Sequence, residues 1–275
     1  MPLLPIGQSE LYYEDQGEGP AIVLAHGIGG NHASWFQQVP VFAQSYRVVT
    51  FDHRGFGRSS DVEGAGRSAF VPDLLALLDR LGIEQAVLVG QSMGGGTCIG
   101  FADAHPERVR ALVLAASLHA IEEDGEVAAL MEAARTATDD LDQLDRVLDP
   151  TFREDNPVQA SLYSAIASFN RADRHSLAGA WPVRLAPEAV GGGKPVLFLA
   201  GTRDPLFPIE AIRQAQGRVP GSFLVEVDAG HSVFFEHATE FNDSVLSFLA
   251  ACGIRGRRRS AHSNAAGYVT PAVQN

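Results

Sequence analysis

Short apolar runs alternate with amphipathic segments along the first 120 residues of the chain. Mainly apolar runs that predict buried strands cover residues 21–25, 47–51, 86–89 and 111–115. Within residues 71–81 the apolar side chains recur three and four positions apart, which is typical of a helix packed on one face. Buried strands joined by helical crossovers form a mostly parallel sheet with both faces covered. The pattern therefore predicts the α/β class.

Shorter segments complete this first part. Residues 11–13 favour a short strand and residues 35–44 a helix. A further helix, rich in glycine, is expected from the end of the run at 86–89 to about His105.

The alternation stops at about Ile121. From there to about Val190 only helical patterns are found, in segments that run approximately over 125–137, 141–148, 157–170 and 175–185. Because strand patterns resume afterwards, this block is an insertion between strands. An insertion at one edge of a sheet is expected to form a lid over that edge.

The strand rhythm returns after the glycines at 191–193. Apolar runs at 195–200 and 223–227 predict two more strands, and residues 239–251 predict a final helix. The remainder is rich in Arg, Ser, Ala and Gly without periodicity, which is typical of disorder. We therefore divide the chain into a core (1–120 and 191–252), a helical cap (121–190) and a disordered basic tail (253–275).

Composition and charge exclude several classes of protein. The 275 residues are 45% hydrophobic and 20% charged, as in an ordinary globular protein, and the net charge is −12. An acidic chain argues against nucleic acid or an anionic membrane as the main partner. No apolar stretch approaches the roughly 18 residues that a membrane span requires.

The cysteine content and the N-terminus bear on location. Two cysteines, Cys98 and Cys252, do not make a disulfide scaffold in a chain of this length, which suits a reducing compartment. The N-terminus shows no pattern of a signal peptide. The expectation is a cytoplasmic protein.

The first chemical signal follows the run at 86–89. The sequence Gly90-Gln91-Ser92-Met93-Gly94 has the Gly-x-Ser-x-Gly pattern of a nucleophile elbow, in which a strand ends, the chain turns sharply at the serine, and a helix begins. Glycines suit this place because the backbone is strained and helix and strand come close. The pattern predicts Ser92 as a nucleophile.

A serine hydroxyl needs a base, and the base needs an orienting acid. Asp204 follows the run at 195–200, and His231 follows the run at 223–227. The order Ser, Asp, His is the one this architecture requires, and the carboxyl ends of parallel strands meet at one edge. We therefore predict a triad of Ser92, Asp204 and His231. Asp228, three residues before the histidine, is the rival acid.

An oxyanion requires two backbone donors that are in place before the reaction. The N–H of Met93, directly after the nucleophile, is one expected donor. The other is expected from the loop after residues 21–25, at Ile28, where neighbouring glycines allow an N–H to point inward. His26 is expected to hold the shape of this loop, and His32 and His53 to be structural.

These motifs together resemble the α/β-hydrolase fold family over about residues 10–252. The matching stretches are His26–Gly29, Asp52–Ser59, Gly90–Gly94, Gly201–Asp204 and Gly230–His231. Within the family the chain is similar to small bacterial carboxylesterases, enol-lactonases and non-haem perhydrolases. The resemblance implies a helical cap, no cofactor and no metal, and a structural turn at Asp52–Ser59. The basic tail departs from the family pattern.

The predicted function is hydrolysis of a carboxylic ester through an acyl-enzyme, with a small-molecule ester as substrate. Ser92 argues against the related branches that use aspartate at the elbow. Carbon–carbon bond hydrolases with the same triad usually carry an aromatic residue after the histidine, where this chain has Ser232. Lactonases are not separated from open-chain esterases by the sequence. A small-ligand receptor on the same fold is the alternative of another class.

Apolar residues next to the motifs, or in the predicted cap, are candidates for the substrate pocket. A small to medium, mainly apolar acyl or alcohol group is expected there, and the oligomeric state is not predicted. The candidates are Trp35, Tyr163, Phe169, Trp181, Leu206, Phe207, Val233 and Phe234.

Overall fold

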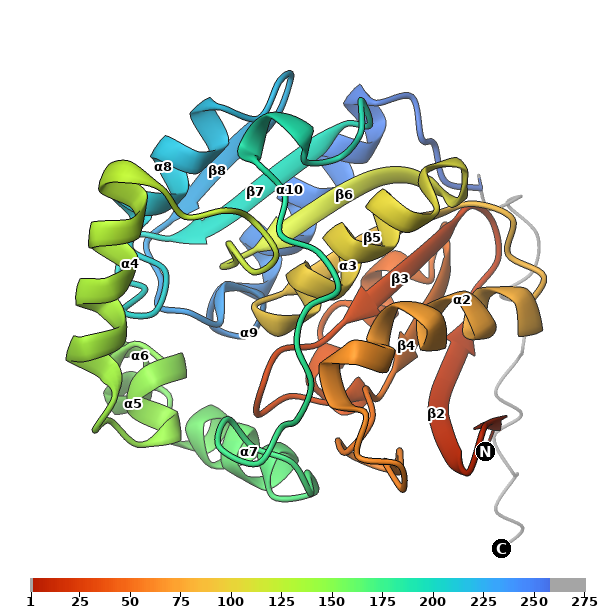
Figure 1. Cartoon of the computed structure of the whole chain (residues 1–275), viewed down its shortest axis with the longest axis horizontal. Helices are drawn as coiled ribbons and strands as arrows, with labels where there is room; N and C mark the ends of the chain where they lie inside the picture. Colours follow the sequence, from red (N-terminus) through yellow and green to blue (C-terminus); the bar gives the residue numbers. More distant parts are fainter. Residues whose placement is uncertain (1, 258–275) are drawn as a thin grey trace, which may run out of the picture.

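One twisted sheet organises the protein (Figure 1). The computed structural model describes residues 2–257, and the strands run in the order β1-β2-β4-β3-β5-β6-β7-β8. From β4 to β8 every neighbouring pair is parallel, whereas β1 and β2 pair antiparallel at one edge. The predicted α/β class and the mostly parallel sheet are confirmed. The strands are β1 Leu3–Ile6, β2 Ser9–Gln16, β3 Ala21–Ala25, β4 Arg47–Phe51, β5 Ala86–Gln91, β6 Val109–Ala115, β7 Val196–Gly201 and β8 Phe223–Val227.

Helices cover both faces of the sheet, as Figure 1 shows for α2 and α3 on the near face and α10 behind. Successive side chains of a strand point to opposite faces, so Val23 joins one buried cluster while Ile22 and Leu24 join the other. Because both faces of the sheet are covered there, central strands such as β3 and β7 consist of apolar residues that are buried on both sides. The core helices are α1 Val39–Phe42, α2 Phe70–Arg80, α3 Met93–Ala104, α8 Ile209–Gly217, α9 Val233–Glu236 and α10 Ala238–Ala251.

Four helices lie between β6 and β7, within residues 121–190, which we call the inserted segment. They are α4 Gly125–Thr138, α5 Gln143–Val147, α6 Pro150–Asp155 and α7 Pro157–Ala167. In Figure 1 they form the green group beside the sheet, and after α7 the chain returns in front of α3 to reach β7. The helix expected at 175–185 is wrong, because this stretch is extended and Leu185 bridges Ile121.

The extended course of 175–185 has a local cause. Gly179 has a φ of +76°, and a Cβ there would lie 2.5 Å from the carbonyl oxygen of Ala65. The adjacent Ala178 carbonyl accepts a hydrogen bond from Arg67 N–H at 3.0 Å. Contacts with a distant loop therefore override the local helical pattern.

Other elements differ from the sequence expectation in extent. Strand β1 and helices α6 and α8 were not predicted, and residues 35–44 hold only the end of a 3₁₀ turn, η1 His32–Trp35, and the short α1. Pro40 lies in the first turn of α1, where a proline is tolerated, and the helix ends at Phe42.

The first residues of the predicted tail are packed against the core, which corrects the expected boundary at 253. Ile254 is buried, and its carbonyl accepts a hydrogen bond from the Tyr46 hydroxyl at 3.0 Å. Arg257 N–H donates to the Ser45 carbonyl at 2.6 Å. Residues 253–257 thus pack on the core, and the rest of the expected tail, 258–275, lies outside the described residues. Between residues 2 and 257, no helix is long and apolar enough to cross a membrane.

Candidate active site

The chain reverses sharply at Ser92, between β5 and α3. Ser92 has φ +49° and ψ −117°, a conformation that is strained for any residue with a side chain. Two hydrogen bonds hold it there: Ser92 N–H donates to the Ala115 carbonyl at 2.9 Å, and the Ser117 hydroxyl donates to the Ser92 carbonyl at 2.7 Å. The turn leaves the serine side chain at the carboxyl edge of the sheet.

Glycines make this turn possible because they allow helix α3 to approach the neighbouring strands closely. A Cβ at Gly94 would lie 2.0 Å from the Ala25 carbonyl oxygen, and one at Gly90 would lie 2.4 Å from the Gly94 carbonyl oxygen. Helix α3 therefore sits directly against β3 and β5. These contacts explain why a buried helix begins with residues of poor helical propensity.

His231 and Asp204 form a buried pair on two neighbouring loops. Asp204 Oδ2 lies 2.9 Å from His231 Nδ1, and both side chains are almost inaccessible to solvent. The other carboxylate oxygen accepts the N–H groups of Leu206 at 2.8 Å and Phe207 at 3.1 Å. The Phe207 ring stacks on the imidazole at 5.7 Å between centroids. The carboxylate is thus fixed by its own loop, and it orients the histidine.

Asp228, the rival acid, lies elsewhere. Its side chain is 80% exposed and forms an ion pair with Arg203. It also accepts a hydrogen bond from the Thr202 hydroxyl at 3.3 Å. The geometry therefore favours Asp204 as the partner of the histidine.

Glu236, at the end of α9, was not singled out by sequence reasoning. Its carboxylate accepts the N–H groups of Gly230 at 2.9 Å and Ser232 at 3.3 Å, on either side of His231. Burial raises the pKa of Glu236 to about 6. This residue therefore holds the histidine loop from behind.

The loop after β3 approaches Ser92 closely. A Cβ at Gly27 would lie 3.0 Å from the Ser92 Cβ. His26 holds this loop, since its Nδ1 lies 2.8 Å from the Gly27 carbonyl oxygen and its Nε2 accepts the His53 N–H at 3.0 Å. Burial lowers the pKa of His26 to about 4 and that of His53 well below its usual value. Both rings are therefore neutral near pH 7.

Two backbone donors in this region have no protein acceptor. Within residues 2–257, neither Ile28 N–H nor Met93 N–H donates a hydrogen bond to the protein. Met93 is fully buried, and Ile28 lines the same cavity as Ser92. Buried N–H groups are nearly always paired, so two free ones beside a nucleophile suit an oxyanion hole.

The turn at Asp52–Ser59 is held by hydrogen bonds and an ion pair within the protein, in line with the structural role that the resemblance implies. Asp52 accepts the N–H groups of His32 at 2.6 Å and Arg58 at 2.8 Å. Arg54 forms a buried ion pair with Asp73 at 2.6 Å. This loop supports the site from outside the cavity.

A cavity of about 660 Å³ connects Ser92, His231 and the inserted segment. Ser92, His231 and Ile28 line it together with three of the predicted pocket residues, Trp181, Leu206 and Phe207. Trp181 packs against α3, where a Cβ at Gly96 would lie 2.7 Å from its indole ring. The inserted segment therefore lies directly over Ser92.

The other predicted pocket residues lie elsewhere, which corrects the sequence interpretation. Trp35 and Phe234 pack on each other at 4.6 Å between ring centroids in the core, and Val233 is buried in the same cluster. Tyr163 lines a neighbouring cavity, and Phe169 is 69% exposed. Proximity in sequence to a motif did not distinguish side chains that face the cavity from side chains that face the core.

Several residues that line this cavity were missed. Most are charged or polar side chains of the inserted segment, where no local motif marks them. They are Arg67, His119, Glu123, Met131, Arg135, Thr138, Gln143, Arg146, Arg174 and Arg184.

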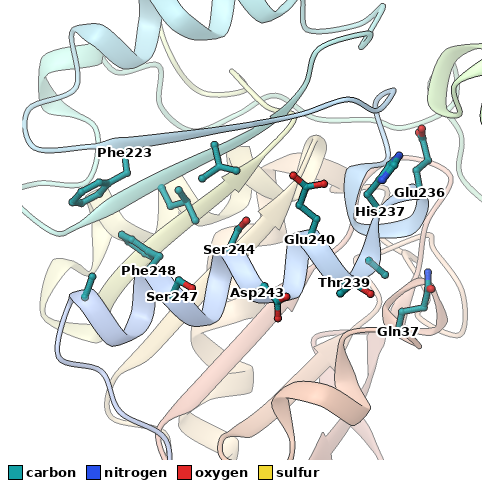
Figure 2. Close-up of a pocket in the computed structure, with 14 residues that line it drawn as sticks. Gln37, Phe223, Glu236, His237, Thr239, Glu240, Asp243, Ser244, Ser247 and Phe248 are labelled. Atoms are coloured by element: carbon teal, nitrogen blue, oxygen red, sulfur yellow. The ribbon is translucent and has the colours of Figure 1, made fainter.

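Another cavity, of about 940 Å³, runs between β8 and α10 (Figure 2). Phe223 and Phe248 lie at one end of it, and Glu240 and His237 at the other. It contains none of Ser92, Asp204 and His231. Although this cavity is larger than the one over Ser92, it is not the candidate active site. Among residues 2–257 there is also no group of three His, Cys, Asp or Glu residues that could hold a metal ion.

Comparisons with known proteins agree with this arrangement. The family model of the alpha/beta hydrolase fold matches residues 20–238. A protein of Synechocystis, provisionally named a non-heme chloroperoxidase, is 30% identical, with 90% of this chain and 100% of the relative covered. The 2-hydroxy-6-oxononadienedioate/2-hydroxy-6-oxononatrienedioate hydrolase of Paraburkholderia xenovorans is also 30% identical, with 89% and 92% covered. The crystal structure of the enol-lactonase from Burkholderia xenovorans superposes with a TM-score of 0.75 at 28% identity, covering 90% and 100%.

Proposed function

The chain belongs to the α/β-hydrolase fold family, and we propose that it is a serine hydrolase that cleaves a carboxylic ester. Ser92 is the nucleophile, His231 the base and Asp204 the orienting acid. The observation that carries this proposal is the buried contact of 2.9 Å between His231 Nδ1 and Asp204, with Ser92 on the same cavity. The substrate is a small-molecule ester.

The reaction proceeds in two acyl-transfer steps. His231 accepts the proton of Ser92 as the serine oxygen attacks the ester carbonyl, and the N–H groups of Ile28 and Met93 stabilise the oxyanion. His231 then donates that proton to the leaving alcohol. In the second step His231 activates water, which hydrolyses the acyl-enzyme and releases the acid.

A cyclic ester is the second candidate substrate. Ring opening of a lactone uses the same nucleophile, base and oxyanion donors, and this chain is similar to an enol-lactonase over the whole length of that protein. A lactone retains its alcohol within the acyl-enzyme, so the cavity needs room for only one fragment.

The decisive experiment is hydrolysis of p-nitrophenyl esters from acetate to decanoate, with Ser92→Ala measured in parallel. Fast turnover that depends on Ser92 supports the proposal, and the chain-length optimum measures the acyl site. A panel of lactones, followed by release of acid at constant pH, tests the cyclic alternative.

Other outcomes point to other functions. A single burst below one equivalent favours a small-ligand receptor on the same fold. Cleavage of a vinylogous diketone without ester turnover favours a carbon–carbon bond hydrolase. The cytoplasmic location and the absence of a cofactor, of a nucleic-acid partner and of a membrane partner stay predictions.

A further inference from the structure

The cavity over Ser92 is strongly basic in a chain that is acidic overall. The whole chain carries 33 acidic side chains against 21 lysines and arginines. Among the residues that line this cavity the balance is reversed, because five arginines face a single acidic residue, Glu123. We call these five the arginine wall: Arg67, Arg135, Arg146, Arg174 and Arg184.

Two members of the wall are already partly neutralised. Arg135 forms ion pairs with Glu123 at 2.9 Å and with Glu132 at 3.2 Å. Arg174 has Asp139 at 3.7 Å. These pairs fix the two side chains, whereas the other three arginines of the wall form no ion pair in the described part of the chain.

Arg67, Arg146 and Arg184 have no carboxylate within ion-pair distance in the described part of the chain. Arg67 donates to the Leu177 carbonyl at 3.0 Å, and Arg146 donates to the Thr138 carbonyl. Burial lowers the pKa of both guanidinium groups. The charge of Arg174 lowers the pKa of Arg146 further, and the charge of Asp139 opposes part of this shift. Arg146 and Arg174 therefore repel each other, and an anion bound between two guanidinium groups removes such repulsion.

The wall also reaches the catalytic residues. His119 lies in the same cavity, and burial first, then the charges of Arg67, His231 and Arg184, lower its pKa to about 3. His119 is therefore neutral near pH 7 and can donate one hydrogen bond. Its ring contacts Phe207, which itself stacks on His231. The positive field thus extends from the inserted segment to the reacting ester.

We propose that the substrate is an ester or lactone that carries an ionised acid group away from the scissile bond, and that the arginine wall binds this group. The guanidinium fork matches a carboxylate or a phosphate in two parallel hydrogen bonds. This inference rests on the proposed serine hydrolase. It replaces the mainly apolar substrate that the sequence suggested with one that is apolar near Ser92 and anionic at its far end.

The test compares esters that differ only at the far end. The p-nitrophenyl monoester of adipate has a carboxylate where the hexanoate ester has a methyl group, and a matched ester with a terminal phosphate forms a third arm. We expect kcat/KM at low salt to be at least about tenfold higher for one of the anionic esters, because the acid group accepts charge-assisted hydrogen bonds that the methyl group cannot form. The better of the two identifies the acid group. The advantage should shrink with added salt.

Variants assign the effect to the wall. Arg146→Met and Arg184→Met should each lower the ratio of anionic to neutral kcat/KM about tenfold, mainly through KM. Arg80→Met is the control, since Arg80 is exposed on α2 and does not line the cavity. A wild-type ratio of one or less overturns the inference. A ratio that both wall variants leave unchanged, or that Arg80→Met lowers equally, overturns it as well.

Binding separates this inference from the proposed function. Calorimetry with Ser92→Ala measures affinity for the adipate and hexanoate monoesters without turnover. Tighter binding of the adipate ester supports the wall even if wild type hydrolyses neither ester, in which case only the hydrolase proposal fails. Equal affinities together with fast hexanoate turnover leave the hydrolase and reject the anionic substrate.

Discussion

The floor and the roof of the Ser92 cavity are built in different ways. The floor consists of loops that follow β3, β5, β7 and β8, and it carries Ser92, His231, Ile28 and Phe207. Hydrogen bonds to the backbone fix its position, as do glycines that pack so closely on neighbouring backbone that a side chain would not fit. The roof is contributed by the inserted segment, and long charged side chains such as Arg146 and Arg184 dominate it.

In the proposed function this difference separates the reaction, which takes place on the floor, from substrate selection by the roof. Acyl transfer requires donors and a base that are in place beforehand, so the floor is rigid and small residues surround it. Recognition of a substrate tail needs charge and reach rather than a strained backbone. Changes in the floor should therefore affect kcat, and changes in the roof should affect KM and substrate choice.

Removal of the nucleophile should have the largest effect. Ser92→Ala is expected to lower kcat by about 10⁴-fold or more, because the oxyanion donors alone retain only a small part of the catalysis. Stopped assays with p-nitrophenyl hexanoate measure the loss, and circular dichroism checks that the fold is intact. Near-normal turnover in this variant would falsify the assignment of the floor.

The orienting acid should come next. Asp204→Asn is expected to lower kcat about 10³–10⁴-fold, because the amide cannot stabilise the charged imidazole that forms during attack. Asp228→Asn is the matched control and should change kcat less than about twofold, since Asp228 is exposed and paired with Arg203. The reverse ranking would mean that the rival acid is the true partner of His231.

Acid should destabilise the floor. His26 is buried, and its folded pKa of about 4 lies below the unfolded value of 6.5. Because the unfolded state binds a proton more readily than the folded state, His26 contributes fully to the free energy of unfolding above pH 6.5. This contribution is lost as the pH falls towards 4. The loss is about 3 kcal/mol from His26 alone, at about 1.4 kcal/mol for each pKa unit. Urea unfolding between pH 4 and 7 measures it.

Glu236 opposes this trend and provides the control. Its folded pKa of about 6 lies above the unfolded value of 4.5, so its contribution is complete below pH 4.5 and is lost as the pH rises through 6. The opposing effect is about 2 kcal/mol, smaller than that of His26. Glu236→Gln should therefore make the destabilisation by acid steeper. A shallower profile in this variant contradicts the assigned directions.

The smallest effect is expected where roof and floor meet. Gln143 of α5 donates a hydrogen bond to the Ile28 carbonyl at 3.2 Å and so steadies the loop that carries an oxyanion donor. Gln143→Ala should lower kcat about three- to tenfold, in line with about 1 kcal/mol for one hydrogen bond. Steady-state kinetics with a neutral ester measure the change. A change in KM with kcat unchanged would mean that Gln143 contributes to substrate binding in the roof and does not steady the Ile28 loop.

Much of the floor could be predicted because its signals are local. The Gly-x-Ser-x-Gly turn at 90–94, and the acid and base after the runs at 195–200 and 223–227, depend on residues next to strand ends. Parallel strands bring these ends to one edge of the sheet. The strands themselves were predictable because burial on both faces requires continuous apolar runs.

The sequence predictions that were wrong concern residues whose conformation is set by contacts with distant parts of the chain. Trp35, Val233 and Phe234 look like pocket residues beside motifs, yet their side chains turn into the core between α9 and η1. The stretch at 175–185 has a helical pattern, but hydrogen bonding of Ala178 to Arg67 holds it extended. Residues 253–257 read as tail, although Ile254 packs in the core.

The sequence by itself determined the sheet, and it predicted the nucleophile, acid and base of the proposed function, because each depends on a short pattern at a strand end. Only the tertiary structure decided that Asp204 rather than Asp228 meets His231. It also decided that arginines from 67 to 184 surround one cavity. Their charges are scattered along the chain without periodicity, and they share one field only after the inserted segment folds over Ser92.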